Sequence, residues 1–461
     1  MLRILVRKEI VSHILSLRFT VTFTLFIVLV FSSMYVMVSN YKQDEAEYYA
    51  RARASQDHLN NILSEEDQDR VWGRLFRDEG RDCEVPVAAL SWLGQGLQPA
   101  QPAAVNLKGR NTRSVDRGLT RNPLLGLFHV PDFVYVVNTA LSLLAILFMF
   151  DAVCGEKEAG TLRLVLSNSV PRHQVLLGKW IGGYIVLVIP FLVSVAGGLI
   201  FAWARGVLEP NADTAIRVLA LTGIACLYIA AFFNLGLFIS TTTKRPATSL
   251  LVCLLVWVTC IVVIPNLGPV AARILKPTPS RKGIEAAKQA VDREINLRSQ
   301  RLTLTSGELS YGDKIQRQRE ELDDERNRRK RELDRYFRRS QKEQLDLART
   351  LGRASPSASW VYSAVALAGT GPDAFESFRT GRESAAKRFT EYYRGMREQA
   401  NRTGWRNRPK VILDEIPSFR ASFPDMAHAV TAALNDILVL AILNVVFFML
   451  AFTFFLRYDV R

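Results

Sequence analysis

The chain has 461 residues and a formal net charge of +15, and 49% of its residues are hydrophobic. The apolar residues gather into six blocks of about 20 residues, the length that crosses a bilayer, which excludes an ordinary soluble enzyme. The positive excess lies largely in residues 271–430, where 33 Lys and Arg face 22 Asp and Glu. Because no aromatic RNA-binding pattern or zinc-ligand spacing accompanies it, we expect no nucleic-acid binding.

The six apolar blocks predict an all-α integral membrane protein with six transmembrane helices. They occupy residues 19–38, 133–150, 180–204, 218–240, 247–270 and 437–456. In the first region, 1–38, apolar and basic residues alternate up to Arg18, which predicts an interfacial elbow helix before the first span. That span is too long for a secretory signal peptide, so we interpret it as an uncleaved anchor with a cytoplasmic N-terminus.

Residues 39–132 form a predicted extracytoplasmic loop. Its first part, 43–63, has no Pro or Gly and many helix formers, so the first helix is expected to continue beyond the bilayer. The end of the loop, 122–132, is rich in turn residues. Cys83 has no obvious disulfide partner, and no His or Cys has another at metal-ligand spacing, so we expect no metal site.

Residues 133–270 hold spans two to five and one compact charged stretch, 151–179, that must lie at a membrane face. As a helix it would gather apolar groups on one side and charged groups on the other. The apolar side comprises Thr161, Leu162, Val165 and Leu166, and the charged groups are Glu156, Glu158 and Arg163. This pattern favours a short surface helix that meets a soluble partner; the alternative is an ordinary polar loop between helices.

Several residues within these spans are candidates for special roles. Pro190 and Pro265 remove a backbone hydrogen bond and are candidate hinges, although membrane helices also tolerate proline without a functional reason. Asparagines stand within apolar runs and are expected to bond between helices, or alternatively to line a transport path. They are Asn138, Asn234 and Asn444.

Residues 271–430 are predicted to form an extracytoplasmic helical domain between spans five and six. An apolar stripe in 281–303 and a highly charged stretch in 313–351 predict a coiled-coil-like hairpin that could project roughly 50–60 Å. The apolar run 355–367 is too short to span, so we expect it to rest on the membrane or on the hairpin base. A further helix follows at 373–400, and region 431–461 supplies span six and a cytoplasmic tail.

The chain lacks any motif for ATP binding or hydrolytic chemistry. Gly178-Lys179 is followed by Trp180, and no residues upstream complete a phosphate-cradling loop. No nucleophile elbow and no zinc-protease motif occurs. We therefore expect no catalytic residues, no cofactor and no enzymatic activity in this chain.

The run from Gly155 to Arg172, G-E-K-E-x-G-T-L-R-L-x-L-S-x-x-V-P-R, with Gly178-Lys179 after it, resembles the cytoplasmic coupling segment of type-2 ABC exporter permeases. The likeness is closest to the branch that serves nitrous oxide reductase maturation. It extends to both ends of the chain and is weakest across 40–120 and the charged hairpin. The resemblance implies that the segment docks on a separate ATP-binding subunit. The implied coupling residues are Gly155, Glu156, Glu158, Gly160, Thr161, Leu162 and Arg163.

The resemblance also implies partners and a location. A dimer of ATP-binding subunits would hold ATP and Mg²⁺, and a second permease chain, identical or homologous, would pair with this one in the membrane. The expected location is the bacterial cytoplasmic (inner) membrane, with both termini cytoplasmic. Two other functions stay open: mechanotransmission to an extracytoplasmic protein partner without substrate transport, and a receptor that holds an anionic ligand on the basic outer domain.

Overall fold

A computed structural model describes residues 2–108, 111–115, 131–167, 170–208, 211–305, 312–404, 408–419, 421 and 423–457. The predicted turns at 122–130 and 306–311 and the tail 458–461 lie outside these residues. The structure divides into a first unit, Met1–Val258 with Ser359–Arg461, and a second unit, Thr259–Ala358. The segment 271–430, expected as one domain, is therefore shared between the two units.

In the part of the chain that the structure describes, six helices are long and apolar enough to cross a membrane, which confirms the six predicted spans and makes the chain a multi-pass membrane protein. They are Phe19–Leu63, Phe133–Glu158, Arg172–Ala204, Ala212–Thr242, Pro246–Leu275 and Met426–Leu456. The corresponding elements in the first unit are α2 (Leu17–Leu63), α5 (Phe133–Val136), η3 (Val137–Leu141), α6 (Ser142–Met149), α7 (Cys154–Glu158), α9 (Arg172–Ala204), α10 (Ala212–Thr242), α11 (Pro246–Val258) and α17 (Met426–Leu456).

The N-terminal segment forms its own helix, α1 (Leu2–Ile14), in place of a straight extension of the first span. Ser16 separates the two helices, because its hydroxyl accepts a hydrogen bond from the Phe19 backbone amide and caps α2. The next 47 residues then form one continuous helix to Leu63. This confirms that the first span continues as a helix well past the length a bilayer requires.

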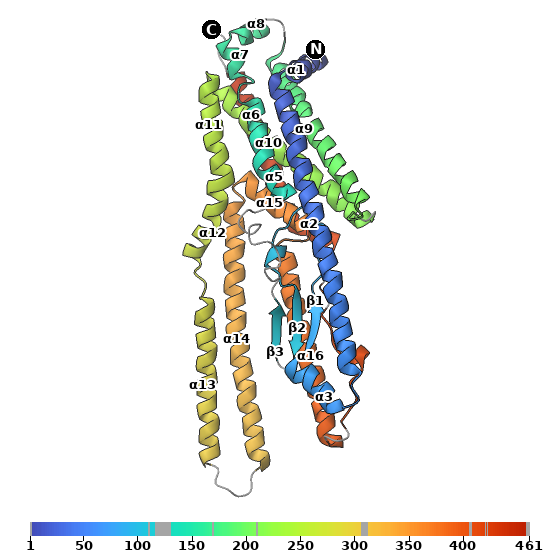
Figure 1. The fold of residues 1–461 in the computed structure, drawn as a ribbon. Helices are drawn as coiled ribbons and strands as arrows, with labels where there is room; N and C mark the ends of the chain where they lie inside the picture. The colour runs from blue at the N-terminus through green and yellow to red at the C-terminus, as the bar shows by residue number, and fades with distance from the viewer. Residues whose placement is uncertain are drawn as a thin grey trace. The chain divides into compact units, whose positions relative to one another are not determined.

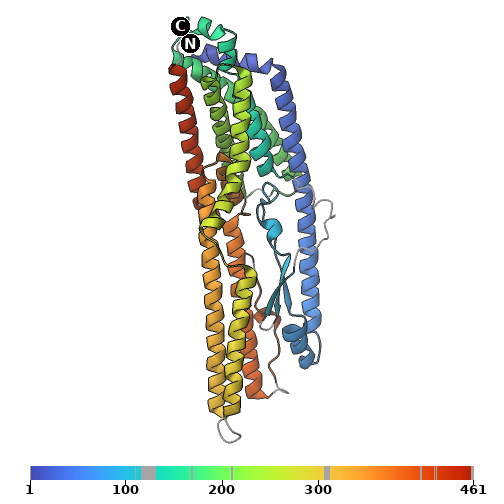
Figure 2. The same cartoon turned by 90° about the vertical axis from the view of Figure 1, so that its left-hand side faces the viewer.

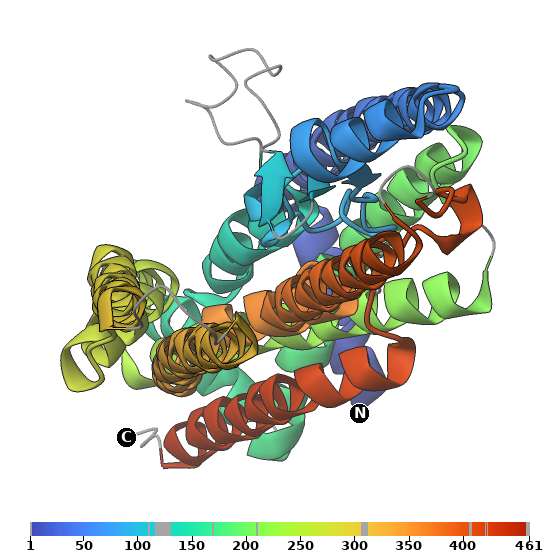
Figure 3. The same cartoon turned by 90° about the horizontal axis from the view of Figure 1, so that it is seen from below.

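A three-stranded antiparallel sheet is present, which the expectation of an all-α protein did not include. Its strands are β1 (Arg81–Glu84), β2 (Ala104–Lys108) and β3 (Asn111–Val115), with Cys83 opposite Val105. β1 is short and polar and shows no apolar alternation, so hydrophobic periodicity gave no strand signal. Viewed along the molecule, the strands lie between α2 and α16 (Pro372–Thr403) (Figure 3).

One hydrophobic core joins this sheet to segments that lie far away in sequence. It takes residues from the end of α2, from α3 (Gln68–Trp72), from the π-helix η1 (Gly73–Asp78), from the sheet and from α16. Its buried side chains include Leu59, Trp72, Phe76, Val105, Phe378, Phe389, Met396, Val411 and Phe419. The predicted loop 39–132 is therefore largely a folded structure, completed by residues near the end of the chain. The short 3-10 helices η2 (Gln98–Ala100) and η6 (Leu413–Glu415) complete this part of the unit.

The second unit contains the predicted hairpin, formed by α13 (Arg281–Thr305) and α14 (Gly312–Gly352), which run side by side (Figures 1 and 2). Ile295 is fully buried on the predicted apolar stripe. Ion pairs join the two helices, with 2.6 Å from Lys288 to Asp334 and 2.6 Å from Lys330 to Asp292. The π-helix η4 (Thr259–Val263) and α12 (Ile264–Leu275) precede the hairpin.

The short apolar run forms α15 (Pro356–Leu367), and its part in the first unit is buried inside the protein. Trp360 is fully buried, its indole N–H donates to the Val134 carbonyl at 3.1 Å, and its ring stacks on Tyr228. The expectation that this run rests on the membrane does not hold for these buried residues. A 13-residue apolar segment is also the length of a core helix, and here that alternative is realised.

Candidate functional site

The predicted coupling segment forms two short helices, α7 (Cys154–Glu158) and α8 (Thr161–Ser167). It lies at the same end of the first unit as α1 and the C-terminal end of α17 (Figures 1 and 2). At that end the Arg172 guanidinium also donates to the Leu456 carbonyl at 2.8 Å. The chain thus gathers the predicted cytoplasmic segments at one end.

The start of α7 is held by a buried serine of α10. Ser240 is fully buried, and its hydroxyl accepts hydrogen bonds from the Val153 and Cys154 amides at 3.0 and 3.2 Å. These amides lie where a helix has no internal acceptors, so the hydroxyl acts as a cap supplied by another helix. In the same region Ser249 of α11 donates to the Phe150 carbonyl at 2.6 Å. The segment is therefore fixed to both α10 and α11.

Lys157 fixes the middle of α7 to the C-terminal end of α10. Its ammonium donates to the Thr241 carbonyl and, at 3.1 Å, to the Thr243 carbonyl. A cation at a helix C-terminus satisfies carbonyls that have no partner within the helix and interacts favourably with the helix dipole. These two carbonyls therefore hold the Lys157 ammonium at the end of α10.

Glu156, expected to face a partner subunit, lies against α9. Its carboxylate accepts a hydrogen bond from the Lys179 ammonium at 2.7 Å, and the same ammonium lies 3.4 Å from Glu9 of α1. Lys179 is only 6% exposed. The second oxygen of Glu156, Oε2, is buried and accepts no hydrogen bond from the part of the chain that the structure describes.

The outer side of the segment is formed by the turn between the two helices and the first turn of α8. Gly160 has φ of +71°, a left-handed conformation that ends α7 and favours glycine. A Cβ added at Gly160 would have no neighbour within 4 Å, so this position faces open space. Glu158, Thr161 and Arg163 are also exposed.

Other predicted coupling residues point inward, and one exposed residue was not predicted. Leu162 is fully buried and Gly155 is half-buried. Leu164, assigned no role from the sequence, is 68% exposed. The segment therefore has an anchored side and an open side, and sequence periodicity alone did not show how they divide.

The two candidate hinge prolines differ in their surroundings. Pro190 is buried in the interior of α9, which continues as a helix from Arg172 to Ala204. Pro265 lies in the first turn of α12, directly after the π-helix η4, within the continuous helical span Pro246–Leu275. Neither location measures a hinge motion, so both assignments stay predictions.

The three asparagines bond between elements, as one of the two expectations held. Asn234 of α10 donates to the Asn444 side chain of α17 at 2.9 Å and accepts from the Trp180 indole of α9. Asn138 of η3 accepts from the Tyr228 hydroxyl at 3.0 Å. Polar side chains therefore connect the spans inside the bundle.

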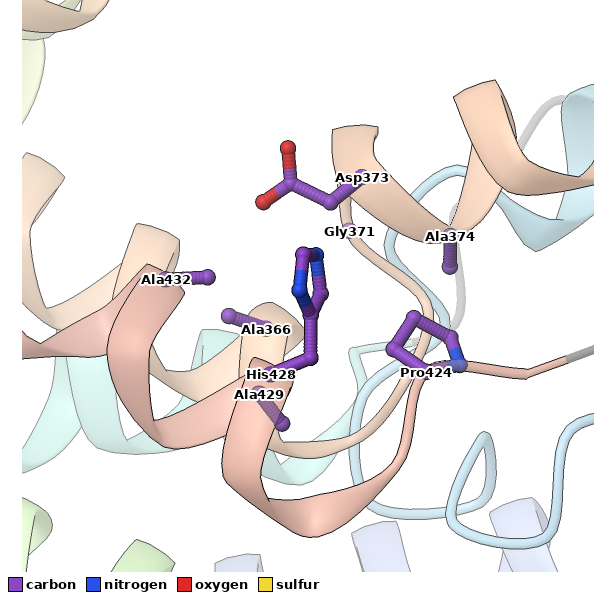
Figure 4. A pocket seen from close by; sticks show the side chains of 8 residues that line it. All are labelled: Ala366, Gly371, Asp373, Ala374, Pro424, His428, Ala429 and Ala432. Atoms are coloured by element: carbon purple, nitrogen blue, oxygen red, sulfur yellow. The ribbon is translucent and has the colours of Figure 1, made fainter.

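A small pocket lies where the starts of α16 and α17 approach each other (Figure 4). Asp373 and His428 reach toward each other across it, and its other lining residues are alanines, a glycine and a proline: Ala366, Gly371, Ala374, Pro424, Ala429 and Ala432. No residue predicted for the coupling function contributes to this pocket. Among the residues with described positions, no group of three or more His, Cys, Asp or Glu side chains is arranged to hold a metal ion.

Among the described residues, three charged side chains that received no role from the sequence are buried: Lys179, Arg217 and Asp436. Lys179 was noted only as part of a sequence motif, and Asp436, inside span six, is fully buried. Asp436 directly precedes the apolar block 437–456. A carboxylate at such a position is a signal that the sequence offers, because ionisable residues in membrane spans usually have a function.

Comparison with known proteins adds an independent observation. A family model described as ABC-2 family transporter protein matches residues 3–460. The chain is 42% identical over 81 residues to a probable ABC transporter permease protein NosY from Stutzerimonas stutzeri, covering 17% of this chain and 29% of that protein. It is 29% identical over 114 residues to its namesake from Pseudomonas aeruginosa, covering 23% of this chain and 40% of that protein. The chain thus spans less than half the length of these relatives.

Proposed function

Because the chain belongs to the ABC-2 family of transporter proteins, we propose that it is the membrane subunit of an ATP-driven exporter. In this proposal ATP and Mg²⁺ are bound by a separate ATP-binding subunit that acts as a dimer. Two permease chains pair in the bacterial cytoplasmic membrane, with both termini and the coupling segment on the cytoplasmic side. The relatives named as NosY permeases support this assignment of role.

The observation that carries the proposal is the division of the coupling segment into an anchored side and an open side. Ser240 and Lys157 connect it to α10, and Lys179 connects it to α9. A Cβ added at Gly160, in the turn between α7 and α8, would meet no described atom within 4 Å. A partner that pushes on this turn would therefore move the ends of two membrane helices directly.

These connections suggest how ATP-driven motion enters the membrane. Closure of the ATP-binding dimer would displace α7 and α8 together, since Gly160 joins them without an intervening loop. The displacement would reach α10 through hydrogen bonds to helix termini and α9 through a largely buried ion pair. Such contacts are rigid enough to transmit a shift, because packed helix ends do not deform continuously.

A matched pair of variants at Gly160 tests the proposal. Gly160→Ala and Gly160→Trp share the same backbone strain of a side chain at positive φ, about 1 kcal/mol, but only Trp adds bulk on the open side. We expect Gly160→Trp to lose co-purification of the ATP-binding subunit while Gly160→Ala largely keeps it, with both variants inserted in the membrane. Equal binding by the two variants would show that the turn is not a docking surface.

A charge reversal at Glu158 tests the electrostatic side of the same docking. Glu158 suits this test because it is exposed. Glu156→Lys would instead place a second ammonium group beside that of Lys179 and disturb the fold itself. At an interface, loss of one member of a desolvated charge pair costs about 2–5 kcal/mol, whereas a rim charge costs little. Binding of the ATP-binding subunit would be measured for Glu158→Lys, and for the native chain at low and high salt. A loss of binding in the variant that high salt does not produce in the native chain would indicate that Glu158 belongs to a desolvated ion pair.

One observation favours the second candidate function, mechanotransmission to an extracytoplasmic protein. Paired charges join α13 and α14 along their length, for example 3.0 Å from Arg329 to Glu294, so the hairpin is built as a stiff element. Reconstitution in liposomes separates the two functions. Substrate-stimulated ATP turnover with measurable translocation supports export, whereas turnover that responds only to an external protein supports mechanotransmission.

A further inference from the structure

Lys179 lies where three elements of the first unit meet. Its ammonium is 2.7 Å from Oε1 of Glu156 in α7 and 3.4 Å from Oε1 of Glu9 in α1, while its backbone belongs to α9. A lysine near a membrane surface normally extends its ammonium to water or headgroups. This one is 6% exposed, so its charge is compensated by the two carboxylates.

The contact between α1 and α9 fixes the geometry of this ion pair. Gly178 and Gly182 stand four residues apart on α9, the spacing that lets two helices approach closely in membranes. A Cβ at Gly178 would lie 2.9 Å from Cβ of Leu5, and one at Gly182 would lie 2.7 Å from Cβ of Glu9. The α1 backbone is therefore seated on the two turns of α9 that carry Lys179.

The two carboxylates do not depend on Lys179 equally. Glu9 also lies 3.7 Å from the Lys8 ammonium and 3.9 Å from Nε2 of His13, both on its own helix, and the imidazole carries a charge only when protonated. Glu156 has Lys179 as its only ion-pair partner in the described chain, and its Oε2 accepts no hydrogen bond there. A displacement of α7 therefore acts first on the short Glu156–Lys179 ion pair. Lys179 then transmits the displacement to α1 through its contact with Glu9.

We propose that Lys179 is a positioning residue that makes the elbow helix α1 move together with the coupling segment. This inference rests on the proposed function, because it assumes that the ATP-binding subunit displaces α7 and α8. It adds that α1 is a moving element of the transport cycle and that the Glu9–Lys179–Glu156 ion pairs carry the motion to it. The glycine contact alone seats α1 on α9 but does not connect it to α7.

Spin-label distances in the full complex, in nanodiscs with its ATP-binding subunit, test this directly. One label pair joins Ile4→Cys on α1 to Ile442→Cys on α17, and a second joins Glu158→Cys to the same reference; Ile4 and Ile442 are 69% and 60% exposed. The labels are placed in a chain whose five native cysteines have been replaced. With no further substitution, ATP is expected to shift both distances. In Glu9→Gln the Glu158 shift should remain and the Ile4 shift should become smaller, because only the glycine contact with α9 then still moves α1.

The controls separate the possible failures. Lys8→Met removes an exposed partner of Glu9 and should leave both shifts intact, and Lys179→Arg, which keeps a cation for both carboxylates, should preserve them. Lys179→Met should behave as Glu9→Gln does; if it does not fold, Glu9→Gln alone decides, because it leaves the Glu156 bond in place. An Ile4 shift as large in Glu9→Gln as in the native complex overturns the inference. Absence of any Glu158 shift in the native complex instead contradicts the proposed function.

Discussion

Lys157 shows how one residue in a charged segment can be structural while its neighbours are open to a partner. It stands between two glutamates in the charged segment, and its ammonium is bound to the last carbonyls of α10. The two glutamates beside it differ in the same way: Glu156 lies against Lys179, whereas Glu158 is exposed to solvent. Charge pattern alone does not distinguish these cases.

Lys157→Met is accordingly expected to destabilise the protein and to weaken coupling. Hydrogen bonds made by charged groups contribute about 1.5–3 kcal/mol, and the α10 carbonyls would lose the cation. Thermal unfolding in nanodiscs should show the loss, and Lys157→Arg should recover part of it because it keeps a cationic donor. A Lys157→Met chain as stable as the native one would mean that water replaces the ammonium at the end of α10.

At the candidate site, the sequence predicted the segment but not the direction of its side chains. Its place between two spans follows from hydropathy, and the turn at Gly160 follows from glycine chemistry. The inward direction of Leu162 and Glu156 depends on Ser240 and Lys179, which lie elsewhere in the chain. Tertiary contacts of this kind leave no periodic signal in the segment itself.

Among the elements, α9, α10 and α17 are connected by a chain of polar side chains. The Trp180 indole, Asn234 and Asn444 form consecutive hydrogen bonds, and Asn444 also donates to the Leu227 carbonyl at 2.9 Å. In membrane proteins such bonds average about 0.6 kcal/mol and reach about 1.7 kcal/mol. The connection is therefore modest per bond, and its effect lies in fixing the register of the three spans.

A double-mutant cycle measures this connection. We expect Asn234→Val and Asn444→Val each to lower the unfolding free energy by about 1 kcal/mol, within the range for buried interhelical bonds. The double variant should lose less than the sum, because both single changes remove the same Asn234–Asn444 bond. Strict additivity of the two losses would contradict the bond.

The sheet element contains a buried carboxylate that makes its stability depend on pH. Glu84 of β1 has a side chain that is 7% exposed, 3.5 Å from Arg51, and burial raises its pKa above the ordinary value. The neighbouring Asp82 raises the pKa further, whereas a hydrogen bond from Ser55 and the charge of Arg51 lower it. The folded chain therefore binds this proton more tightly than the unfolded chain.

The stability that Glu84 contributes is thus full at acid pH and is lost as the pH rises through its raised pKa. Glu84→Gln should make the full-length chain more stable than the native chain at neutral pH, with the difference disappearing near pH 4. Glu79 is the matched opposite, since its hydrogen bond with Arg74 lowers its pKa. Glu79→Gln should destabilise at neutral pH and become neutral in acid. Melting curves in nanodiscs from pH 4 to 8 would reveal either trend, and parallel curves for both variants would refute the assignment.

At the level of elements, the long helices were predictable because hydropathy and helix formers act locally. The six spans, the extension of α2 and both arms of the hairpin follow from such local signals. The sheet was not predictable, because β1 and β2 are four and five residues long and are stabilised by packing against α2 and α16. The burial of Trp360 likewise depends on Val134 and Tyr228, which are distant in sequence.

For the whole molecule, the hairpin tests whether the second unit supports membrane assembly. α12 packs against the end of α14, and a Cβ added at Gly268 would lie 2.9 Å from the Ala348 carbonyl. Deletion of 288–341 should therefore leave insertion and ATPase binding intact, since it keeps the part of α14 on which α12 packs. Deletion of 288–352 should impair span five, because it also removes the surface on which α12 packs. Equal insertion of both deletions in a protease-protection assay would show that α12 does not need α14.

The hydrophobic core of the first unit is completed late in synthesis, because its two halves lie far apart in the sequence. Residues 59–107 supply Trp72 and Phe76, but their packing partners Phe378, Phe389 and Phe419 emerge only after the hairpin and its preceding span. At ribosomal rates of roughly 5–20 residues per second, about 15–60 s separate the two halves of this core. During that interval the early half exposes aromatic surface and an unfinished sheet, the features that make nascent chains aggregate. The first loop of the growing chain therefore needs protection from aggregation until α16 has been synthesised. The charged hairpin lies between the two halves of the core, so its length adds to that interval.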